Sequence, residues 1–423
     1  MNLSQRDKLY NWHPYTQHKT ATDFPAIIKG KDALLWDENG KEYIDAIASW
    51  WVNPYGHSNK FIADAIYEQL ITLEHVLFGG FTHDKAVLLA EKLMTILPNN
   101  QKKLFYSDNG STAVEVALKV ALQYNYNKGI KKTKIIAFED AFHGDTFGAM
   151  ASSGISFFTE AFKGSLLDVI RIPVPTDGNE EKSLQALKNL IVTNEYAAFI
   201  FEPLVQGAAG MIMYAPEILD TMILLCNDNN VFTIADEVMT GFGKTGKTFA
   251  SDYLVNKPDM MCLSKALTGG TIPMAITTFT QEIFQGFYDD DTNKALFHGH
   301  TFTANPTGCA AALASITLLQ TDDMQHNIAR INLSHLAFEQ KIKAHPKVKT
   351  TRVLGVIFAL EIKTETLESY YGTMRNKLYN FFIENSIIIR PVGNIIYLLP
   401  PYVITNTQLE KVYTTIEKAL EIV

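Results

Sequence analysis

Short apolar runs alternate with longer amphipathic stretches through the middle of the 423-residue chain. Runs rich in Val, Ile, Phe and Thr are typical of buried strands, whereas apolar residues that recur roughly every three or four positions are typical of helices. Helices are predicted, for example, over Ser111–Tyr124 and Pro216–Asn227. The alternation predicts an α/β fold with a mostly parallel sheet covered by helices. The predicted strands are Leu104–Ser107, Lys134–Phe138, Ala197–Phe201, Val231–Ala235, Met260–Leu263 and Pro273–Phe279.

The pattern changes after Asn305. Two long helical stretches are followed by strands around Thr351–Glu361, a helix over Glu368–Glu384, a pair of strands and a final helix near Gln408–Ile422. Such a succession predicts a second, smaller α+β domain at the end of the chain.

Composition and charge limit the classes of partner. A chain of this length with 47% hydrophobic residues can bury a large core. Its formal net charge of -8 offers no basic surface for nucleic acid or anionic lipid. No apolar stretch reaches the roughly 18 residues of a membrane span, and the N-terminus is unlike a signal peptide. We therefore expect a cytoplasmic protein whose partners are small molecules and a second copy of itself.

The cysteines favour the same compartment. Cys226, Cys262 and Cys309 are too few and too scattered for a disulfide framework or a CxxC metal site. Their apolar neighbours are typical of buried thiols in a reducing compartment.

Lys265 and Asp236 are the residues that carry the clearest chemistry. Asp236 closes the apolar run Val231–Ala235, and Lys265 lies just beyond the run Met260–Leu263. A lysine amine can hold an aldehyde cofactor as a Schiff base, and a carboxylate at a strand end can keep a pyridine nitrogen protonated. A protonated ring withdraws electrons and makes the α-proton of an amino acid removable. The pair therefore indicates pyridoxal 5'-phosphate.

Two glycine-containing passages fit the same cofactor. The passage Phe105–Thr112 is typical of a strand, a turn and a helix start, where free N–H groups at Gly110 and Ser111 could hold a phosphate. An ordinary capping box explains these residues equally well. In the passage Phe142–Thr146, an aromatic ring at a strand end could lie over the pyridine ring, although Phe142 could also be a core residue.

Two other passages suggest different chemistry. Two histidines flank a glycine in Phe297–Pro306, but no carboxylate or cysteine at ligand spacing accompanies them, so no metal is expected. Gly241–Thr248 satisfies the G-x-x-x-x-G-K-[ST] phosphate-loop pattern, which leaves a nucleotide-hydrolysing protein as a distant alternative. The loop does not follow its strand directly, and Phe249–Tyr253 is a poor start for the required helix.

Three segments together resemble the class III pyridoxal-phosphate aminotransferases, namely Ile234–Val238, Ser264–Gly270 and His298–Thr301. They occur in the family's order, and the resemblance covers nearly the whole chain. It implies fold type I, a seven-stranded large domain over residues 48–305 and a small domain formed by residues 1–47 and 306–423. It also implies a homodimer with both active sites at the interface.

The resemblance implies a role for individual residues. Lys265 is expected to hold the cofactor and to act as the catalytic base, and Asp236 is expected to pair with the pyridine nitrogen. The phosphate would be held from both subunits, and two side chains would enclose the ring. The further residues implied for cofactor binding are Gly110, Ser111, Phe142, Val238, and, from the other subunit, His300 and Thr301.

A narrower resemblance concerns the substrates. The segments Trp12–Thr16, Ala48–Trp51, His75–Gly80 and Arg390–Tyr402 are similar to family members that aminate 8-amino-7-oxononanoate with S-adenosylmethionine in biotin biosynthesis. A guanidinium fork such as that of Arg390 matches a carboxylate bidentately. The residues implied for substrate binding are Tyr15, Trp51, Phe142, Asp145, Gly299 and Arg390.

Three positions depart from the family pattern. Phe142 stands where tyrosine is usual, Lys244 where arginine is usual, and His300 where proline often occurs. These changes remove a phenol and a guanidinium near the amino donor. Two alternatives therefore remain open: lysine as the donor in the same reaction, or another class III enzyme such as an ω-aminotransferase.

Overall fold

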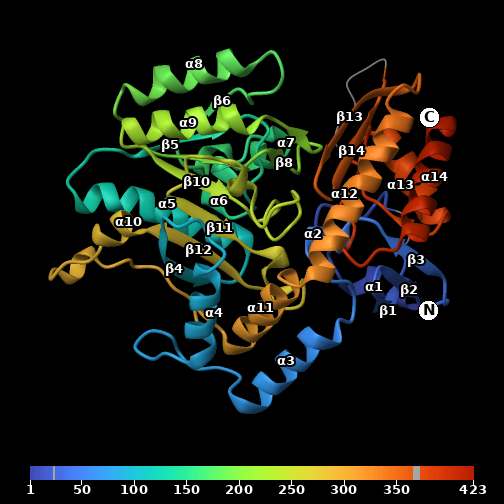
Figure 1. Ribbon diagram of the computed structural model, residues 1–423, viewed down its shortest axis with the longest axis horizontal. Coiled ribbons are helices and arrows are strands. Elements are labelled where there is room, and N and C mark those ends of the chain that lie inside the picture. The colour runs from blue at the N-terminus through green and yellow to red at the C-terminus, as the bar shows by residue number, and fades with distance from the viewer. Residues whose placement is uncertain (22–23, 365–371) are drawn as a thin grey trace.

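The computed structural model describes residues 1–21, 24–364 and 372–423, and its central feature is a seven-stranded sheet (Figure 1). The strand order is β4-β12-β11-β10-β7-β5-β6. All neighbouring strands pair in parallel, except that β12 is antiparallel to both β11 and β4. The predicted mostly parallel sheet is therefore confirmed. Its strands are β4 (Gln101–Ser107), β5 (Lys134–Phe138), β6 (Val169–Ile172), β7 (Tyr196–Phe201), β10 (Phe232–Asp236), β11 (Met260–Leu263) and β12 (Ala275–Thr280).

Two differences from the predicted strands have physical reasons. The sequence did not predict β6, because Arg171 interrupts its apolar run; the guanidinium donates to the carbonyl oxygens of Ser153 and Ala151. The direction of β12 was not predicted either. The connection from β11 runs only from Ser264 to Met274 and contains the 3₁₀ turn η3 (Lys265–Thr268), which is too short for the helical crossover that a parallel strand needs.

Helices cover both faces of this sheet. Along β5, the side chains of Ile135 and Ala137 belong to the cluster that contains α5, whereas those of Ile136 and Phe138 belong to the cluster on the opposite face, with α9. This alternation is the period-two pattern of a strand buried on both sides. The elements associated with the sheet are α3 (Lys60–Thr72), α4 (Asp84–Met94), α5 (Gly110–Asn127), α6 (Phe147–Ser152), α7 (Ser156–Thr159), η1 (Glu160–Ser165), α8 (Glu180–Ile191), β8 (Val205–Gln206), β9 (Ile212–Met213), α9 (Pro216–Asp228), η2 (Ala250–Tyr253), α10 (Gln281–Gln285), η4 (Thr292–Lys294) and α11 (Pro306–Leu319).

The two ends of the chain come together beside the large sheet (Figure 1). Strand β15 (Ile387–Ile388) pairs in parallel with β3 (Glu42–Asp45), so one small sheet contains both N-terminal and C-terminal residues. A second sheet is antiparallel, in the order β13-β14-β16. The other elements of this part are α1 (Leu3–Tyr10), β1 (Ile27–Lys31), β2 (Leu34–Asp37), α2 (Ala48–Trp51), α12 (Asp322–Ile342), β13 (Val348–Leu354), β14 (Ile357–Ile362), α13 (Thr373–Glu384), β16 (Ile395–Leu398) and α14 (Asn406–Ile422).

The C-terminal predictions agree with this part of the fold. The strands expected around Thr351–Glu361 form the hairpin β13-β14, and the final helix is α14. Helix α13 begins at Thr373, and the earlier start predicted at Glu368 lies outside the described residues. The division into domains at residues 48 and 305 stays a prediction. Within the described ranges, no helix is long and apolar enough to cross a membrane.

Candidate active site

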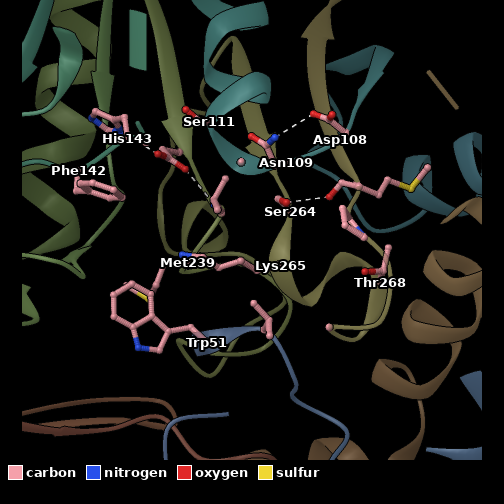
Figure 2. A pocket seen from close by; sticks show the side chains of 18 of the residues that line it. Trp51, Asp108, Asn109, Ser111, Phe142, His143, Met239, Ser264, Lys265 and Thr268 are labelled. Carbon is pink, nitrogen blue, oxygen red and sulfur yellow. Dashed lines mark hydrogen bonds and ion pairs between the residues drawn. The ribbon is translucent and has the colours of Figure 1, made fainter. Parts of the chain in front are cut away.

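A cavity of about 480 Å³ opens at the carboxyl-terminal edge of the large sheet, the edge at which open α/β sheets bind ligands. Strand β10 ends here at Asp236, β4 leads into the start of α5, and Lys265 follows β11. Figure 2 shows Lys265 in the middle of the cavity, with Trp51 on one side and Ser111 on the other. The predicted cofactor residues that line it are Gly110, Ser111, Phe142, Asp236, Val238 and Lys265.

The start of α5 has the geometry of a phosphate seat. Asn109 caps the helix by accepting a hydrogen bond from the Thr112 N–H at 3.0 Å, so a capping box is present, formed by Asn109 and Thr112 rather than by a Ser or Thr with an acidic residue. The first N–H groups of a helix have no partner within the helix and carry its positive dipole. A Cβ atom on Gly110 would lie 2.6 Å from Cγ1 of Val238, so only glycine lets this helix start come so near the cavity wall. These residues fit a phosphate group.

Asp236 is a buried carboxylate in a fixed orientation. Its Oδ2 lies 2.7 Å from Nδ1 of His143, and its Oδ1 accepts a hydrogen bond from the Val238 N–H at 3.1 Å. His143 is also buried, and its Nε2 has no hydrogen-bond partner among the residues described. Because a carboxylate only accepts, Nδ1 of His143 carries the proton and holds Asp236 toward the cavity. A carboxylate so placed fits the protonated nitrogen of a pyridine ring.

Lys265 lies beside the ring of Trp51, with its Nζ 4.6 Å from the ring centroid. Burial lowers the pKa of the Lys265 amine to about 8, and the negative charges of Asp236 and Glu202 oppose this shift. The backbone of Lys265 is left-handed, with φ of 51°, a conformation that is uncommon outside glycine and is often found at functional sites. The lowered pKa increases the fraction of neutral amine at physiological pH, and the neutral amine is the form that acts as a base or nucleophile.

The lowered pKa of Lys265 leads to a prediction about cofactor attachment. When cofactor-free protein is mixed with pyridoxal phosphate, the rate at which the visible absorption band grows should rise with pH and level off above about 8. The reason is that only the neutral amine attacks an aldehyde, and the neutral fraction increases until pH exceeds the pKa. Stopped-flow absorbance from about pH 6 to about pH 12, a range that includes both the shifted and the ordinary lysine pKa, measures this profile. If the midpoint of the pH profile lay near the ordinary lysine pKa, the lowered pKa of Lys265 would be wrong.

A second cavity, of about 580 Å³, shares Trp51, Phe142 and Lys265 with the first. Its wall contains charges of both signs. Among them are Arg390, which lies 4.3 Å from the centroid of the Trp50 ring, and Asp145, which accepts a hydrogen bond from the Tyr15 hydroxyl. A cavity with apolar aromatic walls and a few polar groups is typical of a small-molecule site. The predicted substrate residues that line it are Tyr15, Trp51, Phe142, Asp145 and Arg390.

Three predicted residues, Gly299, His300 and Thr301, line neither of these cavities in the described part of a single chain. Their segment is flanked by Phe297 and Phe302, whose side chains are 68% and 63% exposed. The structure of one chain therefore does not bring this segment to its own Lys265.

Some lining residues were given no role from the sequence. Glu202 follows β7 at the ligand-binding edge of the sheet, and its carboxylate accepts hydrogen bonds from the N–H groups of Phe142 and Gly207. Burial raises the pKa of Glu202 to about 7. Its position directly after a buried apolar run in the sequence could have indicated Glu202 as a site residue, because ligands bind at the ends of such strands. Arg375 and Phe158 line the second cavity, but they are distant in sequence from the recognised motifs, so no local pattern indicated them.

The Gly241–Thr248 loop does not form a phosphate site. Lys244 is fully buried, and its Nζ donates to the carbonyl oxygen of Gly241 at 3.3 Å. The segment after the loop forms the 3₁₀ turn η2 rather than a helix, so no helix N-terminus faces the loop. A phosphate-binding lysine must reach its ligand, so the nucleotide-hydrolysing alternative is wrong. In the parts of the chain that are described, no group of three or more His, Cys, Asp or Glu side chains could hold a metal ion.

Comparison with known proteins agrees with this geometry. The family described as aminotransferase class-III matches residues 15–420. The chain belongs to this family. Class III aminotransferases are pyridoxal phosphate-dependent transaminases, and this chain is therefore such an enzyme.

The relatives of this class III aminotransferase include proteins with a specific name. An adenosylmethionine-8-amino-7-oxononanoate aminotransferase from Synechococcus elongatus is 41% identical over 418 residues, which cover 97% of this chain and 98% of the relative. The crystal structure of the protein of that name from Methanocaldococcus jannaschii has a TM-score of 0.94 at 35% identity and covers 99% of this chain and 98% of its own. An ω-transaminase from Pseudomonas jessenii, crystallised with PMP, has a TM-score of 0.92 at 26% identity. The match covers 100% of this chain and 98% of the ω-transaminase.

Proposed function

We propose that this enzyme transfers an amino group from S-adenosylmethionine to 8-amino-7-oxononanoate and so forms 7,8-diaminononanoate for biotin synthesis. The observation that carries the proposal is the aromatic cavity that contains Lys265 at one place on its wall and Arg390 at another. A long keto acid needs both a reacting end and a carboxylate site. The names of the Synechococcus and Methanocaldococcus relatives support the same substrates.

The cofactor of the proposed reaction is pyridoxal 5'-phosphate. When bound, it supplies an aldehyde carbon for the amino group and a protonated ring that withdraws electrons. In this chain, Lys265 would hold the aldehyde, and Asp236 would form an ion pair with the ring nitrogen. Phe142 and Val238, which both line the cavity, would enclose the ring, and the start of α5, at Gly110 and Ser111, would hold the phosphate.

Lys265 also performs the proton transfer in this proposal. With pyridoxal phosphate bound, the Nζ atom of Lys265 would take and move the proton of the donor α-carbon, and the cofactor ring would supply the electron withdrawal that makes this proton removable. The lowered pKa of Lys265 suits this role, because a larger fraction of the amine is then neutral at physiological pH than for an ordinary lysine. The acceptor half-reaction runs the same steps in reverse. Trp51 covers the amine from one side and limits the access of water.

The second cavity would bind the keto acid at two charged points. Arg390 would hold the carboxylate bidentately, and stacking on Trp50 fixes the direction of its guanidinium. Asp145, oriented by the Tyr15 hydroxyl, would attract the 8-amino group. The aromatic walls between these charges match the apolar carbon chain of the substrate.

The substitution Arg390→Met should raise the KM for 8-amino-7-oxononanoate about 100-fold, because a bidentate charge-assisted contact contributes about 3 kcal/mol. Steady-state kinetics with the keto acid varied at a fixed donor concentration measures this change. The substitution Arg375→Met, which removes another guanidinium from the same cavity, is the matched control and should have a smaller effect. An unchanged KM in Arg390→Met would show that Arg390 does not bind the substrate carboxylate.

The donor is tested by the first half-reaction alone. Cofactor-loaded protein mixed with S-adenosylmethionine should lose its visible band, and a parallel sample with lysine should keep it. Lys244 is buried and lines neither cavity among the described residues, so its difference from arginine does not remove a donor contact here. Fading with lysine alone would establish the lysine-dependent alternative. Fading with neither donor would point to another ω-aminotransferase.

We also propose that the enzyme is a homodimer. Large apolar side chains are exposed on α3, on α4 and on the segments near them, which is unusual for a surface that faces water. A second copy of the chain would cover them and would bring Gly299, His300 and Thr301 to the phosphate of its partner. The exposed side chains include Phe61, Tyr67, Leu70, Ile71, Leu77, Phe81, Val87, Leu88, Phe297 and Phe302.

The cytoplasm is the proposed compartment. All three cysteines, Cys226, Cys262 and Cys309, are free and buried. Burial raises the pKa of each thiol above its usual value, which keeps the thiols protonated and unreactive. A chain without disulfides suits a reducing compartment.

A further inference from the structure

The segment that carries Trp50 and Trp51 has an unusual backbone. Ala48, Ser49 and Trp51 all have positive φ, at 46°, 59° and 65°, although none of them is glycine. Trp50 between them is also outside the helical region, with φ of -137° and ψ of 57°. Non-glycine residues rarely adopt such conformations, and a run of them persists only where surrounding contacts hold it in place.

This backbone has a direct consequence for the cavity. Adjacent side chains point about 100° apart on a helix and to opposite faces of a strand. Here Trp50 and Trp51 both line the second cavity. The ring of Trp50 lies against Arg390, at 4.3 Å, and the ring of Trp51 lies against Lys265, at 4.6 Å. The turn therefore places one aromatic ring against each of the two basic side chains that the proposed reaction uses.

The contacts that hold this turn come from Asp45, a fully buried carboxylate at the end of β3. Its Oδ1 accepts a hydrogen bond from the Ile47 N–H at 3.1 Å, and its Oδ2 accepts one from the Ser49 N–H at 2.7 Å. Nε2 of His57 lies 2.8 Å from the same Oδ2. The carboxylate thus satisfies two N–H groups of the strained turn and is itself oriented by an imidazole.

His57 is fixed from both of its sides. Its Nδ1 lies 2.9 Å from the amide Nδ2 of Asn53, so Nδ1 accepts and Nε2 donates to Asp45. Its backbone exchanges two hydrogen bonds with Asp32, at 2.8 Å and 3.1 Å. Gly30 makes this packing possible, because a Cβ atom there would lie 2.7 Å from Cβ of His57. The imidazole is therefore a rigid anchor for Asp45.

We propose that Asp45 and His57 are a pair of positioning residues that holds the Trp50–Trp51 turn and thereby aligns Arg390 with Lys265. Neither residue lines the two cavities, so the pair acts through the turn. The identity of the substrate rests on the proposed function, whereas the alignment of the Arg390 and Lys265 side chains does not. Loss of the pair should weaken binding of the keto acid more than binding of the cofactor.

The test compares His57→Leu with His57→Gln, because the glutamine amide can still donate to Asp45 and leucine cannot. The KM for 8-amino-7-oxononanoate should rise at least about tenfold in His57→Leu, as expected for small misplacements, and should return toward the wild-type value in His57→Gln. Cofactor affinity, measured by titration of the cofactor-free protein, should stay the same. Asp45→Asn, which keeps the volume of the side chain but places an amide group against donors, should behave as His57→Leu does.

The matched control is His335→Leu. His335 is also buried and also has two partners, the Tyr413 hydroxyl at 2.7 Å and the Val356 carbonyl at 3.1 Å, but it lines neither cavity. The substitution His335→Leu should lower the melting temperature and leave the KM for 8-amino-7-oxononanoate unchanged. If His57→Leu and Asp45→Asn do the same, or if His57→Gln fails to restore KM, the pair is only structural and the proposal is wrong.

A second measurement does not depend on the substrate. The tryptophan fine structure in the near-ultraviolet circular dichroism spectrum of cofactor-free protein should change in His57→Leu, be restored in His57→Gln, and stay unchanged in His335→Leu. If wild-type protein does not turn over the keto acid, the proposed function fails, and this spectrum still decides whether the pair holds the turn. An unchanged spectrum in His57→Leu would overturn the proposal.

Discussion

Lys265→Ala is expected to reduce turnover by more than about 10⁴-fold, the upper range for loss of a general acid–base group, because the same amine also holds the cofactor. Alanine can neither bond an aldehyde nor accept the α-proton. Steady-state assay of the purified, cofactor-saturated variant measures the loss. Borohydride reduction followed by denaturation should leave the cofactor attached to the wild-type chain and not to the variant. Retained turnover would overturn the assignment of Lys265.

The proposed dimer can be tested by mixing the Lys265→Ala variant with a second inactive variant. Thr301→Glu should also be inactive as a homodimer, because a negative charge would face the phosphate of the partner's site. When the two inactive variants are mixed and allowed to exchange subunits, one site in each mixed dimer contains both Lys265 and Thr301. Activity should therefore reappear on mixing. No recovery from demonstrably mixed dimers would mean that Thr301 serves its own chain or neither site.

The sequence predicted most strands of the large sheet, because strands such as β7 and β11 are continuous apolar runs buried on both faces. The runs at β5 and β11 were located to the residue. The same reasoning could not locate β6, where Arg171 finds its hydrogen-bond partners in another segment. A strand that contains a charged residue is predictable only when the partner of that residue is known.

Site residues could be predicted where they stand in the sequence directly beside a recognisable strand or motif. Lys265 and Asp236 stand next to buried strands, and the edge of a parallel sheet collects such positions. Arg375, from α13, and Phe158 reach the cavity only through the tertiary fold. The turn at Trp50 and Trp51 was not predictable either, since its conformation is imposed by contacts from Asp45 rather than by turn-forming residues.

Asp236→Asn should keep the cofactor bound and slow removal of the donor α-proton about a thousandfold, equivalent to ~4 kcal/mol in the barrier. Asparagine keeps the volume of the side chain and can still accept a hydrogen bond. It carries no negative charge, so it cannot keep the ring nitrogen protonated in this buried position. Single-turnover fading of the visible band with the amino donor, together with a cofactor titration, separates the chemical effect from binding.

The matched control is Asp259→Asn, the same isosteric change just before β11, where the side chain contacts the start of β10. The Asp259 carboxylate accepts hydrogen bonds from the N–H and hydroxyl groups of Thr233, both at 2.8 Å. Asp259 lines neither cavity, so its loss should lower stability without slowing the half-reaction. A single-turnover rate in Asp236→Asn that equals that of the control would remove Asp236 from the mechanism. A thousandfold difference between these two Asp→Asn changes would instead assign the effect to charge at the cavity, since the loss of carboxylate hydrogen bonds is common to both.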